Sequence, residues 1–138
     1  MRYYQGRLLD HIHLRVRNFN ASREFYQAVL DALGRTDCTG FGRDWMECDE
    51  LFIEEVTPGE QVSQVHLAFQ APDKASVERF HEAAIAAGGR DNGPPGGRDY
   101  HPGYFAAYVL DPDGNNIEAK FDERVSRRSA QGIEIDIN

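Results

Sequence analysis

The chain has 138 residues and a mass of 15.6 kDa, a size typical of one domain whose core needs no disulfides. Its 41% hydrophobic and 28% charged residues exclude a disordered chain, and its apolar runs are too short for a membrane helix of about 20 residues. A formal net charge of −8 argues against binding to nucleic-acid phosphates. We therefore expect one domain over residues 1–138 that binds neither nucleic acid nor membrane.

The N-terminal residues carry neither the apolar stretch nor the small-residue cleavage site of a secretory signal. The two cysteines, Cys38 and Cys48, are too few for a disulfide framework. We expect a cytoplasmic protein in a reducing compartment.

The first half of the chain predicts a strand, a helix and further strands, in that order. Polar and apolar side chains alternate up to Val16, as in a strand. Asn20 is a candidate N-cap, and Gly34 a candidate C-terminal cap, for a segment whose apolar residues recur at helical spacing. The predicted elements are a strand over 8–16, a helix over 21–33, and strands over 35–41, 44–49 and 51–56.

The same order returns after a linker over residues 57–63. A new alternating segment follows it, then a helical segment that opens at Pro72-Asp73 and ends at Gly88-Gly89. Asp111-Pro112-Asp113-Gly114 has the composition of a tight turn. The predicted elements are strands over 65–70, 104–110 and 116–121, a helix over 73–87, and a Gly/Pro-rich loop over 90–103 with at most one short strand.

The order strand-helix-strand-strand-strand is therefore present twice, in a module at 8–56 and a module at 64–121. Each module predicts an amphipathic helix on one face of a small sheet, which is an α+β fold. The other sheet face is left to form a cleft or to meet a partner sheet. In the tail over 122–138, Ile133, Ile135 and Ile137 alternate with acids, which fits a peripheral strand, a partner contact or a frayed end.

Two histidines and two glutamates occupy matched positions in the two modules. His11 and His66 lie in the first strand of each, and Glu54 and Glu118 each follow an isoleucine in the last strand. Alternation turns all four away from the helix-facing apolar side chains, towards the cleft face. Imidazole and carboxylate together bind borderline divalent metals such as Zn, Ni, Fe and Mn, and two of each leave positions open for substrate oxygens.

Each of these four residues, taken alone, fits a solvent-facing strand position better than a ligand, and the matched placement favours the metal interpretation. His13 shares their face without a histidine counterpart, so it either lines the pocket or is a satisfied sheet histidine. A register error of one residue would exchange Glu54 for Glu55. His81 and His101 are expected at the surface.

Three segments resemble the vicinal oxygen chelate superfamily, which includes glyoxalase I, bleomycin-resistance proteins and extradiol dioxygenases. The first segment is His11-Ile-His-Leu-Arg-Val-Arg together with the following Ala21-Ser-Arg-Glu-Phe-Tyr-Gln-Ala-Val-Leu. The second is Val65-His-Leu-Ala-Phe, and the third is Asp111-Pro-Asp-Gly-Asn-Asn-Ile-Glu. The resemblance covers about residues 8–121. It implies two βαβββ modules that form an open, barrel-like cleft. It also implies a divalent metal held by His11, Glu54, His66 and Glu118, and a homodimer in which each cleft takes one module from each subunit.

The resemblance favours a metal-dependent, glyoxalase-like enzyme that binds a small substrate through vicinal oxygens. Its reaction would be an isomerisation of the lactoylglutathione-lyase type, with Glu118 or Glu54 moving the proton. An Fe(II) dioxygenase is a second possibility. A non-enzymatic resistance protein is the third, with an aromatic compound bound among Trp45, Phe52, Tyr104 and Tyr108. Candidate substrate contacts are His13, Arg98, Tyr100 and Tyr104, although the chain shows no placeable glutathione-binding arginine pattern.

Overall fold

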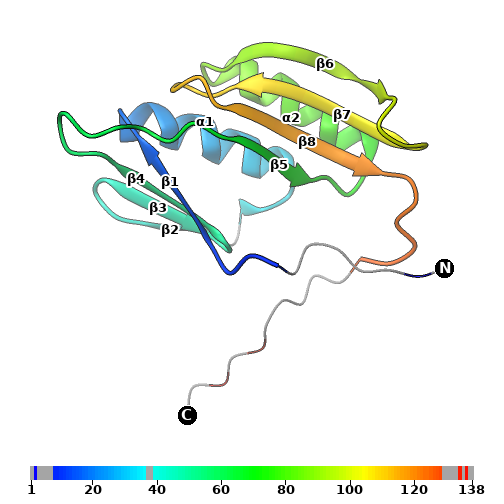
Figure 1. The fold of residues 1–138 in the computed structure, drawn as a ribbon, viewed down its shortest axis with the longest axis horizontal. Helices are drawn as coiled ribbons and strands as arrows, with labels where there is room; N and C mark the ends of the chain where they lie inside the picture. Colours follow the sequence, from blue (N-terminus) through cyan, green and yellow to red (C-terminus); the bar gives the residue numbers. More distant parts are fainter. Residues whose placement is uncertain (1, 3–7, 37–38, 129–133, 135, 137–138) are drawn as a thin grey trace.

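The computed structural model describes residues 2, 8–36, 39–128, 134 and 136. The isoleucine pattern of the tail and part of the segment at 35–41 lie outside them. Within the described residues, two four-stranded sheets lie on one side of the molecule and two helices on the other (Figure 1). The predicted α+β fold of two βαβββ modules is confirmed, and the two sheets do not close into a barrel.

The first module follows the predicted order closely. Its strands pair in the order β1-β4-β3-β2, so the first strand lies beside the last and runs parallel to it. The other neighbours are antiparallel. The elements are β1 (Ile12–Val16), α1 (Phe19–Ala32), β2 (Thr39–Phe41), β3 (Trp45–Cys48) and β4 (Leu51–Glu55).

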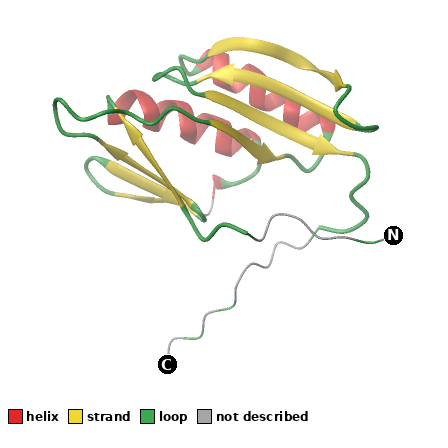
Figure 2. Ribbon diagram, viewed as in Figure 1, coloured by secondary structure: helices red, strands yellow, loops and turns green. Residues whose placement is uncertain are grey.

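The second module repeats this topology, with strand order β5-β8-β7-β6 and a parallel β5–β8 pair. Figure 2 shows the two sheets as two separate groups of yellow strands, side by side, with the red helices behind them. The elements are β5 (His66–Gln70), α2 (Lys74–Ala86), β6 (Arg90–Arg98), β7 (Tyr104–Leu110) and β8 (Asn116–Asp122).

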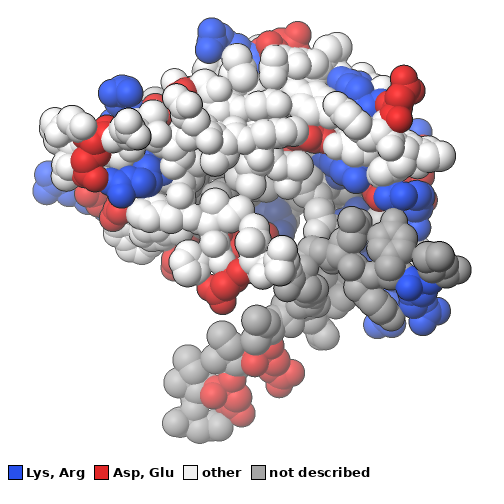
Figure 3. Space-filling view, viewed as in Figure 1, with Lys and Arg blue, Asp and Glu red and all other residues white. Residues whose placement is uncertain are grey.

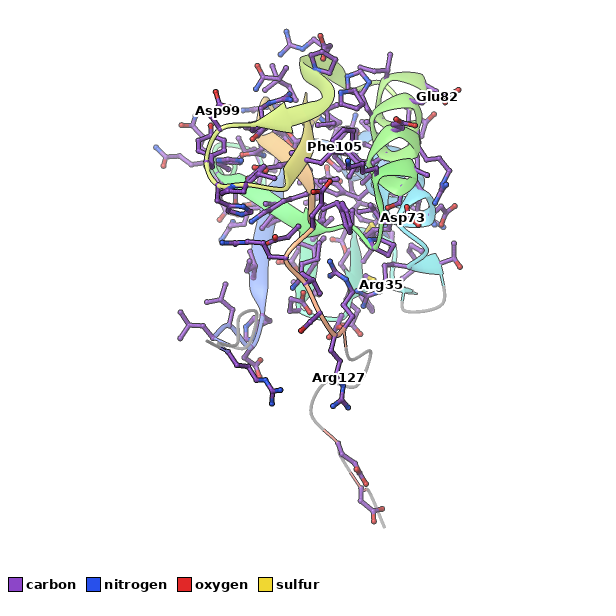
Figure 4. All side chains as sticks on the ribbon, turned by 90° about the vertical axis from the view of Figure 1, so that its right-hand side faces the viewer. Arg35, Asp73, Glu82, Asp99, Phe105 and Arg127 are labelled. Atoms are coloured by element: carbon purple, nitrogen blue, oxygen red, sulfur yellow. The ribbon has the colours of Figure 1, made fainter. Side chains whose placement is uncertain are left out.

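Both helices begin at side-chain caps. Asn18 accepts a hydrogen bond from the Ala21 backbone N–H at 3.1 Å, so the cap lies two residues before the predicted Asn20. Asp73 and Ser76 form a reciprocal capping box at the start of α2, where Figure 4 labels Asp73. Each helix therefore starts at a fixed place beneath its own sheet.

The hydrophobic core lies between the sheets and the helices. It takes alternate residues of β1, β3, β4, β7 and β8, including Leu14, Ile53 and Ile117, and the inner faces of α1 and α2. In Figure 4, Phe105 lies on the side of its sheet that faces α2, and it packs against the core. The helices also contact each other, which joins the two modules through their apolar layer.

A buried polar cluster makes a second connection between the modules. The Tyr26 hydroxyl of α1 donates to Asp111 Oδ2 in the β7–β8 turn at 2.6 Å. The same carboxylate accepts the Asp113 backbone N–H at 2.9 Å and the Asn115 backbone N–H at 2.8 Å. Asp111 is only 2% exposed, so these bonds replace its water. The Asp-Pro-Asp-Gly turn is thus an anchor for the first helix.

The loop predicted over 90–103 is where the structure departs most from the sequence pattern. Residues Arg90–Arg98 form a nine-residue edge strand, β6, paired antiparallel with β7. The register shifts on both sides of Gly93, and the second irregular stretch contains Pro94 and Pro95. An edge position and irregular pairing let a strand carry prolines, which have no N–H to donate.

No helix among the described residues is long and apolar enough to cross a membrane.

Candidate functional site

The sheet faces opposite the helices carry the polar residues that the sequence singles out. Strand alternation sends Leu14 and Ile53 to the core and leaves His13 and Glu54 on the open face of the first sheet. In the second sheet, the same alternation leaves His66 and Glu118 on the open face. Figure 3 views the molecule from this side, where uncharged atoms dominate the middle and most charged side chains lie towards the edges.

Glu118 is the most unusual group on this face because its carboxylate is buried. The residue is 1% exposed, although it lies on a strand face with no helix over it. His66 Nε2 lies 2.8 Å from Glu118 Oε1, and the Tyr104 hydroxyl donates to Glu118 Oε2. Both carboxylate oxygens therefore have a partner, as a buried acid requires.

Aromatic and basic side chains surround this pair. The Tyr104 ring centre lies 5.0 Å from that of Tyr100, 5.0 Å from that of His101 and 4.3 Å from the Lys120 ammonium. The His66 ring centre lies 6.0 Å from that of Tyr108. Burial, and then the hydrogen bond to Glu118, raises the pKa of Tyr104 well above its ordinary value. Its hydroxyl therefore remains protonated, and a donor, throughout the neutral pH range.

The first sheet carries a more open pair. His13 Nε2 lies 3.3 Å from Glu54 Oε1, and both side chains are partly exposed. The Phe52 ring centre lies 5.0 Å from that of His13 and 5.9 Å from that of Trp45, with which it stacks. Glu55 differs from Glu54, because its Oε2 accepts the backbone N–H of Phe19 at the start of α1 at 3.4 Å.

His11 lies apart from this pair. It precedes β1, its side chain is 67% exposed, and its Nδ1 lies 2.7 Å from Asp10 Oδ1. The histidine beside Glu54 is instead His13, which the sequence indicated as either a pocket-lining residue or a satisfied sheet histidine. The strand registers agree with this pairing: Glu54 lies opposite Arg15, two residues after His13, and Glu118 lies opposite Ala68, two residues after His66.

The four predicted ligands thus do not come together within one chain. His66 meets Glu118, and Glu54 meets His13. Among the described residues, no group of three or more His, Cys, Asp or Glu is placed to hold a metal ion. Each sheet offers one imidazole and one carboxylate, which are donor types that borderline divalent metals prefer.

Three of the predicted substrate contacts, Arg98, Tyr100 and Tyr104, lie around the second sheet, and His13 lies on the first. The Arg98 guanidinium lies 5.3 Å above the Tyr108 ring, and it bonds to the Pro94 carbonyl oxygen at 2.7 Å. Tyr100 is 74% exposed at the β6–β7 turn, close to Asp99, which Figure 4 labels at the outer end of that turn. A depression of about 670 Å³ at this turn is lined in part by Arg98, His101 and Tyr104 but does not reach Glu118.

Sequence reasoning missed Lys120 on this face. It lies two residues after Glu118 in β8, so alternation alone places it on the same side of the sheet. Its ammonium is 3.8 Å from Asp122, a carboxylate to which Arg124 donates two hydrogen bonds at 2.9 and 3.0 Å. The Arg124 hydrogen bonds hold the pKa of Asp122 well below its ordinary value, so this acid stays ionised beside Lys120. The other two histidines are engaged elsewhere, His81 with Asp91 at 2.9 Å and His101 with the Pro102 carbonyl oxygen at 2.8 Å.

The repeated module, with a His–Glu pair on each open face, matches a known family. The family model described as Glyoxalase/Bleomycin resistance protein/Dioxygenase superfamily matches residues 8–119. The chain belongs to this superfamily. Its curated relatives include the uncharacterised protein YqjT of Bacillus subtilis, which is 30% identical over 80% of this chain and 95% of that protein.

Solved structures of the superfamily agree with the fold. A glyoxalase/bleomycin resistance protein from Albidiferax ferrireducens T118 is 30% identical, with a TM-score of 0.68 over 82% of this chain and 98% of that one. A glyoxalase-related enzyme from Fulvimarina pelagi is 21% identical, with a TM-score of 0.65 over 91% of this chain and 95% of that one. The second likeness is evidence of the fold alone, and function has to be argued from the site.

Proposed function

We propose that the protein is a metal-dependent enzyme of the glyoxalase type, which binds a small substrate through two adjacent oxygens. The observation that carries this proposal is the buried Glu118 carboxylate held against His66 on an open sheet face. Burying a carboxylate is costly, and a site that keeps one beside an imidazole is a candidate for metal binding or proton transfer.

The donor set fits a divalent metal in two halves. His66 and Glu118 would supply one half of the ligands, and Glu54 and His13 of the first sheet would supply the other half. When bound, the metal would act as a Lewis acid towards the substrate oxygens. Because a single chain does not bring the halves together, we propose a homodimer in which each site takes one sheet from each subunit.

The carboxylates would carry out the proton transfer. In an isomerisation of the lactoylglutathione-lyase type, Glu118 or Glu54 takes the proton from the carbon beside the carbonyl. It returns that proton to the neighbouring carbon, so that atoms balance without an oxidant. Arg98, Tyr100 and Lys120 lie at the edge of the Tyr104 and Glu118 cluster, where they would contact the substrate.

Metal analysis tests the proposal first. Protein purified without a histidine tag or chelator, then supplemented with Ni, Zn, Mn or Fe, is expected to retain close to one metal per subunit. The His66→Ala variant should lose it, and the His81→Ala variant should keep it, because His81 lies on α2. If the wild-type protein binds none of the four metals, the enzyme proposal fails, and binding of an aromatic compound beside Trp45 and Phe52 becomes the better candidate.

Subunit mixing tests the shared site. Glu54→Ala and Glu118→Ala each remove one half, so neither homodimer holds a complete site. A mixed dimer of the two variants keeps one intact site of two, and random mixing should restore about a quarter of wild-type metal binding, given two-fold symmetry. No recovery in a mixture shown to exchange subunits would contradict the shared site. Turnover of methylglyoxal with glutathione then tests the lyase chemistry.

A further inference from the structure

Glu118 depends on Tyr104 for half of its hydrogen bonding. His66 occupies Oε1, and the Tyr104 hydroxyl occupies Oε2. Among the described residues, the ion pair of Glu118 is with His66, and no Lys or Arg contacts its carboxylate directly. The Tyr104 hydroxyl is therefore a neutral donor that restrains the orientation of the buried carboxylate, and the Tyr108 hydroxyl lies beside both groups.

The strand register shows that this contact depends on a specific local arrangement. Tyr108, not Tyr104, lies directly opposite Glu118, and Tyr104 lies opposite Asp122 at the other end of the pair. The Tyr104 side chain must therefore lie along the strand to reach Glu118. The residue between the two tyrosines on that face of β7 is Ala106, whose methyl group leaves room for a ring.

The Tyr104 ring is also restrained by a phenol ring, an imidazole ring and an ammonium group. Tyr100 and His101 lie beside it with ring centres at 5.0 Å, and the Lys120 ammonium lies 4.3 Å from its centre. These contacts come from both the β6–β7 turn and β8. A ring restrained from several sides keeps its hydroxyl at one point, which is what orienting a carboxylate requires.

We propose that Tyr104 is a positioning residue, whose hydroxyl holds the Glu118 carboxylate in the orientation that offers Oε1, beside His66, to a divalent metal. This assignment rests on the proposed function, and it replaces the simpler expectation that Tyr104 is a substrate contact. Hydrogen-bond partners of a ligating carboxylate commonly change metal affinity by about 10–100-fold when they are removed.

The experiment compares Tyr104→Phe with Tyr26→Phe, which removes the hydroxyl of a buried tyrosine that donates to Asp111, away from the sheet face that carries Glu118. Affinity for Ni(II) is measured by competition with a chromophoric chelator, and the melting temperature of each metal-free variant is recorded. We expect Tyr104→Phe to weaken Ni(II) binding by roughly 10–100-fold and Tyr26→Phe, although less stable, to change it less than twofold. A purely structural role would lower the melting temperature of Tyr104→Phe and leave the affinity of the folded protein unchanged.

The outcomes separate this inference from the proposed function. If the wild-type protein binds Ni(II) and Tyr104→Phe binds it within twofold, the positioning role is overturned while the metal site stands. If Tyr104→Phe and Tyr26→Phe lose affinity equally, the loss is a general effect of removing a buried hydroxyl, and the specific role of the Tyr104 hydroxyl is likewise overturned. If the wild-type protein binds no metal, both proposals fail.

Discussion

Replacing Tyr26 with Phe removes one hydroxyl from the polar cluster that ties α1 to the β7–β8 turn. That hydroxyl donates to Asp111 Oδ2 at 2.6 Å, and Tyr26 is fully buried. A hydrogen bond to a charged group contributes about 1.5–3 kcal/mol, and both partners are buried away from bulk water. We expect the free energy of unfolding to fall by that amount, which for a chain of this size lowers the melting temperature by roughly 5–12 °C.

The pH dependence gives this prediction a second measurement. Burial, followed by the Asp111 carboxylate, raises the pKa of Tyr26 well above its ordinary value. Above a pH of about 10, where tyrosines of the unfolded chain lose their protons, the folded protein still holds this one. The unfolded state then binds fewer protons than the folded state, so stability falls as the pH rises through this range. The fall should be shallower in Tyr26→Phe than in the wild-type protein.

Differential scanning calorimetry at fixed protein concentration, at pH 7 and between pH 9 and 11, measures both effects. Tyr100→Phe is the matched control and should change stability by less than about 0.5 kcal/mol, because Tyr100 is largely exposed. Equal melting temperatures for Tyr26→Phe and Tyr100→Phe at pH 7 would show that the buried bond to Asp111 does not stabilise the fold.

Two further predictions concern the backbone. Asn18→Ala should destabilise the protein by about 1 kcal/mol because it removes the cap of α1. Asn20→Ala, inside the helix, should change the free energy of unfolding by less than about 0.5 kcal/mol. Urea unfolding of the two variants measures the difference, and a larger loss at Asn20 would contradict the cap assignment. Gly103 and Gly114 both have positive φ, of 77° and 87°, but a Cβ at Gly103 would lie 2.7 Å from the Glu123 Cβ, whereas one at Gly114 meets no atom within 4 Å. Gly103→Ala should therefore lower the melting temperature more than Gly114→Ala, and the opposite order would refute the reasoning.

The module repeat could be predicted from the sequence because each element follows a simple period. In the part of the chain that the structure describes, both helices and seven of the eight strands occur where hydrophobic spacing indicates them, to within a few residues. Strand β6 was not predicted because its glycines and prolines do not alternate between polar and apolar side chains. It pairs with β7 alone, as an edge strand with an irregular register. The cap of α1 was misplaced because Phe19, a buried residue, already belongs to the first helical turn.

The sequence predicts which face of its strand each candidate residue lies on. It predicts less well which residues of neighbouring strands lie beside each other. Alternation places His66 and Glu118 on one face, and the structure has them 2.8 Å apart although they are 52 residues apart in sequence. The choice between His11 and His13 depends on how β1 is aligned with β4, which hydrophobic spacing does not determine. The Tyr104 contact depends on a side chain that lies along its strand, and Lys120 was overlooked although the period of two includes it.

The parallel pairing of the first and last strands in each module determines when the functional groups can meet during folding. His66 is synthesised as part of the first strand of its module, whereas Glu118 is synthesised only with the last strand, after α2 and two further strands. Contacts between residues so distant in sequence form late, since the intervening chain must be ordered first. A nascent chain that ends at Leu110 has the histidine and the tyrosine but neither the carboxylate nor the strand that β5 pairs with. We therefore expect partly synthesised chains to lack this half-site, so that its formation reports that the second module has completed its fold.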